Sequence, residues 1–193
     1  MTYRIFISYA TGDENSVKEI YETLSRLEDI EVYIPEHGQN IENVGQKIKE
    51  SLDRSNLVIV LITFNSTNTM WLNQEIGYAS GKNMPILSIV EKGIDVEGFL
   101  KGQSHIVFQR GDFKYNAYHV VSELRKKLFQ CLNIASIHFV VTCPSCSKKQ
   151  SETLLSQEDM DAKIQQRQKL RYQCKFCFKV LYVDPMNLEV QTN

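Results

Sequence analysis

The run of residues 57–63, LVIVLIT, constrains the fold more than any other stretch of the sequence. Every residue before its terminal threonine is Leu, Val or Ile, and β-branched side chains favour a pleated strand. A strand that exposes one face alternates apolar with polar residues, whereas this run does not alternate. We therefore predict a central strand of a parallel sheet, buried on both faces.

Apolar segments on either side supply the other elements of such a sheet. Further strands are predicted at residues 4–9, 31–34, 85–90 and 106–108. Apolar residues at three- and four-residue spacing predict amphipathic helices, and Asp13 stands where it could cap the first. The apolar positions are Val17, Ile20, Tyr21, Leu24 and Leu27, then Val44, Ile48 and Leu52, and finally Ala117, Val120, Val121, Leu124 and Leu128. Strands alternating with helices predict an α/β fold with a doubly wound parallel sheet and right-handed crossovers.

Residues 68–81 predict one more helix, with Gly81 at its end. Trp71 and Glu75 lie four residues apart, so on a helix they share one face. Doubly wound sheets bind ligands outside the carboxyl ends of their strands. The strand at residues 57–63 leads directly into this helix, which makes Trp71 and Glu75 the candidate active centre.

Four of the five cysteines form two C-x-x-C pairs in the last third of the chain. Cys143 and Cys146 stand in C-P-S-C, and Cys174 and Cys177 stand in C-K-F-C. Because residues 1–15 show no secretory signal, we expect these pairs to bind a metal rather than form disulfides. Their spacing is that of a zinc ribbon, in which four thiolates surround Zn²⁺ tetrahedrally. The alternative, a redox dithiol, usually needs only one C-x-x-C at a helix start.

The segment around these cysteines has few apolar side chains, so we expect structural Zn²⁺ to supply folding energy that its core lacks. Strands are predicted at residues 139–142 and 172–183. A short helix is predicted at residues 160–166. Cys131 falls near the apolar face of the preceding helix and is predicted to be a buried thiol. The predicted organisation is an α/β domain of residues 1–134 and a small zinc-ribbon β subdomain of residues 135–193.

Composition limits the partners of the chain. The formal net charge of -1 over 193 residues gives no bulk electrostatic reason to expect nucleic acid or an anionic membrane. The basic residues near the cysteines are dispersed along the sequence. No run reaches the roughly 18 apolar residues that span a bilayer. We expect a cytoplasmic protein whose main partner is neither a membrane nor a nucleic acid.

Four segments together resemble a TIR domain. They are RIFISY at residues 4–9, a turn-rich loop at residues 35–40, SLDRSNLVIVLIT at residues 51–63 and WLNQEIGYA at residues 71–79. The resemblance covers roughly the first two thirds of the chain and implies a flavodoxin-like sheet. The form W-x-N-Q-E-I-G-Y-A is more similar to bacterial and archaeal TIR domains than to those of animal receptors.

The resemblance implies an enzyme that cleaves the bond between nicotinamide and ribose in NAD⁺. Glu75 matches the essential carboxylate of catalytic TIR domains, where it would stabilise an oxocarbenium-like ribose. Nicotinamide leaves as a neutral molecule and needs no general acid. Trp71 would form a wall of the site, and Ser8 and Tyr9 match strand-end positions that contact the nucleotide. Water would give ADP-ribose, and a nucleophile within the nucleotide would give a cyclic isomer.

The resemblance also implies a biological setting. Prokaryotic TIR enzymes of both kinds act in antiphage immunity, some of them through a cyclic signal that activates a separate effector protein, and they often self-associate to complete the site. Two alternatives stay open. One is a non-catalytic TIR adaptor that assembles with other TIR domains. The other is a nucleoside deoxyribosyltransferase-like enzyme, which also uses a glutamate on a related sheet.

Overall fold

A five-stranded parallel sheet forms the centre of the protein. The computed structural model describes residues 2–35, 44–66, 69–109, 117–134 and 136–191. The strands lie in the order β2-β1-β3-β4-β5, which is the flavodoxin-like order. Their bounds are β1 Tyr3–Ser8, β2 Ile30–Tyr33, β3 Leu57–Ile62, β4 Ile86–Glu91 and β5 His105–Phe108. The predicted fold class is confirmed, and β3 is the central strand that its composition indicates.

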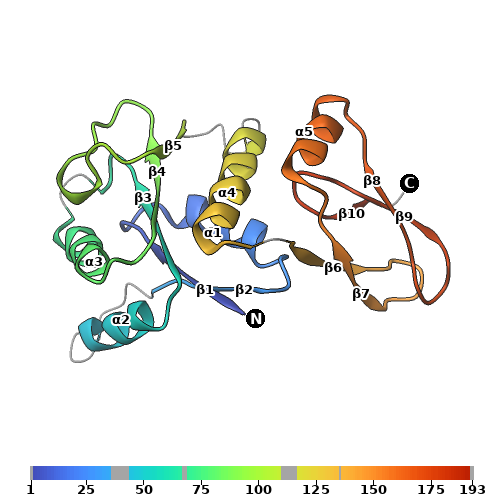
Figure 1. Ribbon diagram of the computed structural model, residues 1–193, viewed down its shortest axis with the longest axis horizontal. Helices are drawn as coiled ribbons and strands as arrows, with labels where there is room; N and C mark the ends of the chain where they lie inside the picture. The colour runs from blue at the N-terminus through green and yellow to red at the C-terminus, as the bar shows by residue number, and fades with distance from the viewer. Residues whose placement is uncertain (1, 36–43, 67–68, 110–116, 135, 192–193) are drawn as a thin grey trace.

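Two layers of helices cover the sheet (Figure 1). Helices α2 (Val44–Asp53) and α3 (Met70–Gly81) pack on one face, and α1 (Glu14–Leu24) and α4 (Ala117–Leu132) pack on the other. Alternate residues of β1 and β3 supply the two apolar cores, because successive side chains of a strand point to opposite faces. A short 3₁₀ helix, η1 (Gly98–Leu100), lies between β4 and β5.

Most predicted core positions of the helices are buried. Ile48 and Leu52 face the sheet from α2, and four residues do so from α4, namely Val120, Val121, Leu124 and Leu128. The side chains of Val44 and Ala117 lie outside the described part of the chain. The turn-rich loop predicted at residues 35–40 also lies outside it, apart from Pro35.

Helix α3 ends at Gly81, as predicted, but the residue with the left-handed conformation lies two positions further on. Gly81 belongs to the helix, and the left-handed residue that stops it is Asn83, with φ of 53°. The Met84 N–H donates to the Ala79 carbonyl at 3.0 Å, and the Asn83 N–H donates to the Ser80 carbonyl at 3.0 Å. This is a Schellman motif, in which asparagine replaces the usual glycine because it tolerates the left-handed conformation.

Residues 138–191 form two small antiparallel sheets and one helix. In the first sheet β6 (His138–Thr142) pairs with β7 (Lys149–Thr153). The second has the order β10-β9-β8. Its strands are β8 Leu170–Gln173, β9 Val180–Val183 and β10 Val190–Gln191, and helix α5 spans Gln157–Gln165. The predicted strands and short helix of this segment are therefore present, together with β7 and β10, which the sequence pattern did not indicate.

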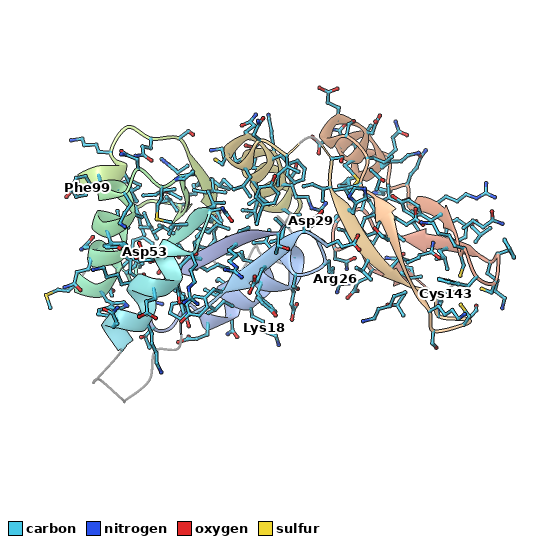
Figure 2. All side chains as sticks on the ribbon, turned by 60° about the horizontal axis from the view of Figure 1, so that its bottom comes forward. Lys18, Arg26, Asp29, Asp53, Phe99 and Cys143 are labelled. Carbon is cyan, nitrogen blue, oxygen red and sulfur yellow. The ribbon has the colours of Figure 1, made fainter. Side chains whose placement is uncertain are left out.

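This C-terminal part packs on the outer side of α1 and α4 (Figure 1). Helix α1 ends at Leu24, so Leu27 lies beyond the predicted helical face and forms an antiparallel bridge with Phe139 instead. Tyr21, predicted on that face, is 41% exposed. Arg26 lies at the junction in Figure 2 and forms an ion pair with Glu189 at 2.5 Å. Apolar side chains from both parts join in one continuous buried cluster.

A buried arginine links the two parts. Arg125 of α4 is 1% exposed, and its guanidinium donates hydrogen bonds to the backbone carbonyls of Pro185 at 2.9 Å and Met186 at 2.8 Å. Burial lowers the pKa of Arg125 to about 10, and the carboxylates of Asp184 and Asp161 oppose this decrease. Within the described ranges, no helix has both the length and the apolar character required to cross a bilayer.

Candidate active site and metal centre

Glu75 lies where the ends of β1 and β3 meet. Its side chain is 3% exposed, and the Ser8 hydroxyl at the end of β1 donates a hydrogen bond to Glu75 Oε2. In this strand order β1 and β3 flank the point where the connections reverse direction, which is where such sheets bind ligands. The structure therefore brings together two predicted site residues that are 67 positions apart in the sequence.

Burial makes the Glu75 carboxyl a weaker acid than an exposed glutamate. It raises the pKa of Glu75 to about 7, while the Ser8 hydroxyl and the Trp71 indole N–H partly oppose the increase. Among the described residues, neither Glu75 Oε1 nor Trp71 Nε1 has a hydrogen-bond partner. The indole is thus near enough to act on the carboxylate but does not have the geometry of a hydrogen bond. Unpaired buried polar atoms cost roughly 1–3 kcal/mol each and are common where a ligand completes the bonding.

A cavity of about 200 Å³ adjoins this carboxylate between α2 and α3. Cavities of roughly 150 Å³ hold benzene, so this one accommodates a single aromatic or sugar ring. It is lined by Gly45, Ile48, Lys49, Leu52, Trp71, Gln74, Glu75 and Tyr78. A Cβ on Gly45 would lie 3.7 Å from the Trp71 ring, so a small residue at this position keeps the space beside the indole open.

Tyr9 lies close to this site but points into the fold. Its side chain is 7% exposed, and its hydroxyl donates to the Pro35 carbonyl at 3.4 Å. Burial raises the pKa of Tyr9, and the charges of Glu14 and Glu75 raise it further. The tyrosine packs beneath the chain that leaves β2, and its contact with a nucleotide stays a prediction.

Asp13 is a buried carboxylate whose role the sequence pattern did not reveal. It stands at the start of α1, but its side chain makes no capping hydrogen bond. It accepts hydrogen bonds from Thr63 Oγ1 at 2.6 Å and from Asn65 Nδ2 at 2.8 Å. Gly12 permits this approach, because a Cβ there would lie 2.9 Å from Asn65 Nδ2. Asp13 thereby ties the loop after β1 to the loop that leads into α3 and Glu75.

We expect Asp13→Asn to lower the free energy of unfolding by about 1–3 kcal/mol, because an amide cannot accept both hydrogen bonds. The double variant Asp13→Asn, Asn65→Asp reverses the donor and the acceptor, so the amide at position 13 can donate to the carboxylate at position 65. It should recover most of the lost free energy of unfolding. Denaturant unfolding of the wild type, both single variants and the double variant measures the coupling. Purely additive effects would contradict the pairing.

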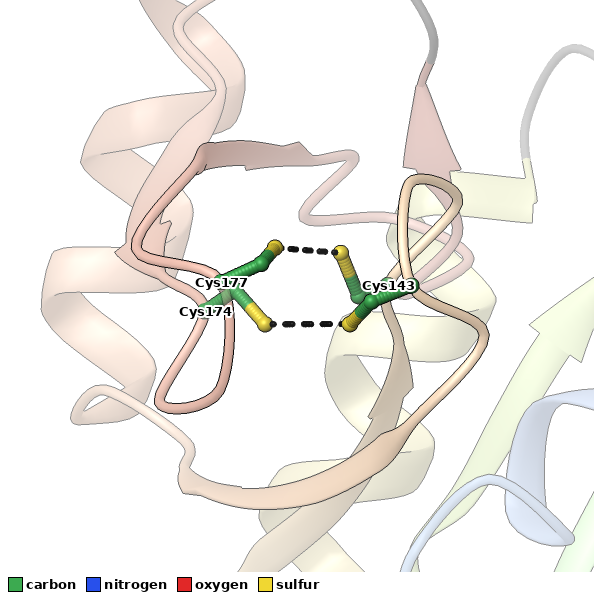
Figure 3. Close-up of side chains that lie close together, drawn as sticks. Cys143, Cys174 and Cys177 are labelled. Atoms are coloured by element: carbon green, nitrogen blue, oxygen red, sulfur yellow. Dashed lines mark hydrogen bonds between the residues drawn. The ribbon is translucent and has the colours of Figure 1, made fainter.

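The four paired cysteines converge on one point (Figure 3). All four Sγ atoms lie within 4.8 Å of one another. Cys143 and Cys177 are 3.6 Å apart, and Cys146 and Cys174 are 3.7 Å apart. A disulfide needs about 2.05 Å, whereas four sulfurs at about 2.3 Å from a tetrahedral Zn²⁺ lie about 3.8 Å from one another. The donor set and its spacing therefore fit a structural zinc ion.

The acidities of these thiols differ between the first and the second cysteine of each pair. For Cys143 and Cys174, burial raises the pKa but backbone N–H groups and neighbouring thiols lower it more. For Cys146 and Cys177, a backbone N–H lowers the pKa, but burial and neighbouring thiols raise it more. Four adjacent thiols cannot all ionise without a positive charge between them, and a divalent metal supplies that charge.

Both cysteine pairs lie on the same kind of turn. The Cys143 N–H donates to the Lys148 carbonyl at 3.0 Å, and the Ser147 N–H donates to the Cys143 carbonyl at 2.8 Å. Ser147 has a positive φ of 57°. The turn that begins at Cys174 repeats this pattern, with Phe178 at a φ of 61°.

A third turn of this shape contains no cysteine. The Asp184 N–H donates to the Glu189 carbonyl at 2.8 Å, and Leu188 has a φ of 59°. Oxygens of Asp184 and Asn187 accept backbone N–H groups at 2.7 and 2.9 Å, as sulfur does in the metal turns. The carbonyls that receive Arg125 belong to this third turn.

Cys131 is exposed, which corrects the prediction of a buried thiol. Leu124, Leu128 and Leu132 continue the inner face of α4 at four-residue spacing, and Cys131 lies beside this stripe. It takes no part in the cysteine cluster.

The protein is a doubly wound α/β protein with a buried carboxylate at the edge of the sheet where such folds bind ligands. Residues 5–121 match the TIR domain family, and the chain belongs to that family. No curated protein matches the chain.

Solved structures support the fold. The chain is similar to the TIR domain of the Toll-related receptor TRR-2 from Hydra magnipapillata, with 17% identity, a TM-score of 0.52, and coverage of 68% of this chain and 99% of that chain. Translation elongation factor SelB from Methanococcus maripaludis has 13% identity, a TM-score of 0.47, and coverage of 70% and 35%. A 2-desoxiribosyltransferase from Leishmania mexicana has 16% identity, a TM-score of 0.41, and coverage of 61% and 98%. These last two similarities carry no argument, so the support for the fold rests on the Hydra TIR domain.

Proposed function

We propose that this protein cleaves the nicotinamide–ribose bond of NAD⁺, with Glu75 as the catalytic carboxylate. TIR domains include NAD-cleaving enzymes and non-catalytic adaptors. The observation that favours an enzyme is the state of Glu75: it is buried, one of its oxygens accepts a hydrogen bond from Ser8, the other has no hydrogen-bond partner among the described residues, and a ring-sized cavity lies beside it. An adaptor gains nothing from a buried carboxylate that lowers the stability of its fold.

In the proposed reaction, the nicotinamide ring occupies the cavity against Trp71. The bond between ribose C1′ and the pyridinium nitrogen breaks, and its electron pair leaves with nicotinamide, which becomes neutral. The ionised Glu75 stabilises the positive charge that develops on the ribose. Water then bonds to C1′ and loses a proton to give ADP-ribose, or a nucleophile of the bound nucleotide closes a cyclic isomer.

The direct test is to incubate the purified chain with NAD⁺, measure nicotinamide release and identify the second product by mass spectrometry. Protein concentration is varied, because TIR domains commonly self-associate and a dilute monomer could lack a complete site. Release of nicotinamide by the wild type supports the proposal. Inactivity at every concentration, together with recovery of a TIR-containing partner by pull-down, would favour the adaptor. Cleavage of deoxynucleosides instead of NAD⁺ would favour a deoxyribosyltransferase.

The activity should depend on pH through Glu75. Only the ionised carboxylate stabilises a cation, so kcat/KM should rise between about pH 6 and pH 8, around a pKa of about 7. Ser8→Ala removes a hydrogen bond that lowers this pKa, so the midpoint should shift to higher pH. Ser88→Ala, at another buried serine on β4 of the same sheet, provides the matched control and should leave the midpoint unchanged. A profile that is flat from pH 5.5 to pH 9 would remove Glu75 from the reaction.

The remaining parts of the proposal concern context. By the W-x-N-Q-E-I-G-Y-A pattern, we place the protein among prokaryotic TIR enzymes of antiphage immunity, where a cyclic product would activate a separate effector protein. The C-terminal residues 135–193 form a zinc ribbon in this proposal, appended to a TIR domain of residues 1–134. Comparing NAD⁺ and its products in phage-infected and uninfected cells that express the wild type tests this assignment.

A further inference from the structure

The two metal turns carry an exposed aromatic and basic surface that no step of the proposed reaction uses. It consists of Phe176, Phe178, Lys148, Lys179 and Val180, and we refer to it as the knuckle surface. Phe176 is 49% exposed and Phe178 is 70% exposed, which is high for side chains of this size. The Lys148 ammonium of the first turn lies 4.8 Å from the Phe176 ring centroid of the second turn, a cation–π contact.

Charge is strongly segregated around this surface. Residues 143–151 contain two Lys and no acidic residue, and residues 162–183 contain six Lys or Arg and no acidic residue. Of these eight cations, Lys175 pairs with Glu152 at 3.3 Å. A zinc ion with four thiolates has a net charge of about -2. Two of the eight positive charges would therefore suffice to neutralise the metal site. Acidic residues stand at the ends of these two runs: Glu152 follows the first and pairs with Lys175, and Asp161 and Asp184 flank the second. Asp161 accepts a hydrogen bond from Ser122 of α4, and Asp184 lies on the third turn toward α1 and α4.

A shallow hollow of about 330 Å³ adjoins the knuckle surface. It is lined by Pro144 and Ser145 of the first turn and by Val180 and Tyr182 of β9, among others. The knuckle surface therefore extends from Phe176 and Phe178 along the exposed side of the second sheet, through Val180 to Tyr182. Arg171 pairs with Tyr182 in the antiparallel register, so it points to the same side of that sheet.

We propose that the knuckle surface binds single-stranded nucleic acid, with bases stacked on Phe176 and Phe178 and phosphates held by the surrounding lysines. Exposed aromatic faces next to cations are the combination that such ligands require, because every base offers a flat face and every nucleotide a negative charge. The sequence did not indicate this partner, since the metal site brings together turns that lie about 30 residues apart. The proposal does not depend on the activity of Glu75.

The test measures fluorescence anisotropy of labelled 15-nucleotide oligothymidine and oligouridine with the full, zinc-loaded chain. Raising the salt concentration from 50 to 200 mM should weaken binding roughly 50-fold if four phosphates are neutralised, as expected from a slope of about -0.7 per phosphate. Phe178→Ala should weaken binding roughly 5- to 150-fold, the range for one stacked base. Lys148→Gln should weaken binding and reduce the salt dependence.

Phe99→Ala is the matched control, since Phe99 is 69% exposed on η1 of the TIR part. It should leave binding unchanged. Zinc content and thermal unfolding of each variant show that the turns are intact. Absence of binding at 50 mM salt, or equal losses for Phe178→Ala and Phe99→Ala, would overturn the proposal. Equal displacement by oligoglutamate would do so as well, because it would indicate attraction to any polyanion or an acidic protein segment.

Discussion

Glu75→Gln should abolish nicotinamide release and, at the same time, make the protein more stable at pH 8. The loss of activity follows from the proposed role, because a neutral amide cannot stabilise a developing cation as a carboxylate does. The gain in stability follows from burial. The substitution removes the charge of a side chain that is only 3% exposed and of which one oxygen has no hydrogen-bond partner within the described ranges.

The size and pH range of the gain follow from the pKa of Glu75. Folding raises it from 4.5 to about 7. Only the protonated carboxyl is compatible with burial. The free energy of unfolding is therefore highest below about pH 4.5 and decreases as the pH rises through 7. At 1.36 kcal/mol per pKa unit, the penalty at pH 8 is about 3 kcal/mol. The variant should therefore gain up to about this amount at pH 8 and almost nothing near pH 4.5.

Denaturant unfolding at pH 5 and pH 8 measures this difference. Glu91→Gln provides the matched control, since Glu91 is also buried but accepts a hydrogen bond from the Phe64 N–H. This variant shows whether replacing any buried glutamate by glutamine gives the same gain. If Glu75→Gln proved less stable than the wild type at both pH values, the carboxylate would have a structural role instead.

Removal of zinc should unfold the segment that contains β6 to β10 and destabilise the whole chain. Apparent binding energies of structural zinc are about 10–16 kcal/mol at pH 7, more than a segment of this size gains from its own core. Because this segment shares a continuous apolar cluster with α1 and α4, its unfolding also uncovers those helices. We expect a chelator, or Cys174→Ser, to lower the thermal midpoint and to reduce the strand signal in circular dichroism.

Cys131→Ser is the control for this experiment, since Cys131 is exposed and outside the cluster. It should leave both the metal content and the thermal midpoint unchanged. Elemental analysis should find one zinc per chain. Protein purified without any metal but with the wild-type melting profile would refute a structural zinc ion.

Those parts of the fold that depend on short-range patterns could be predicted from the sequence. The LVIVLIT run gave the central strand because burial on both faces leaves no polar positions. The alternation of strands and helices gave the parallel sheet, and the two C-x-x-C pairs gave the cysteine cluster, because both patterns repeat within a few tens of residues. Glu75 and Ser8 could be placed at the same edge because all strands of a parallel sheet end there.

Features that depend on contacts across long separations could not be predicted. Asp13 has the sequence position of a helix cap, and its partners Thr63 and Asn65 lie about 50 residues away. Strand β7, KQSET, is too polar for a strand pattern and forms because β6 offers a free edge. The contact of Lys148 with Phe176 exists only once the metal turns face each other.

The turn at residues 184–189 shows that one backbone shape serves two purposes in this chain. With cysteines it presents sulfur to a metal, and with Asp184 and Asn187 it presents carbonyls to Arg125. Replacing the C-terminal part by one that covers Arg125 but has no such turn would therefore leave a buried guanidinium without acceptors, at a cost of about 3–5 kcal/mol. Any substitute module would have to bring its own acceptor turn.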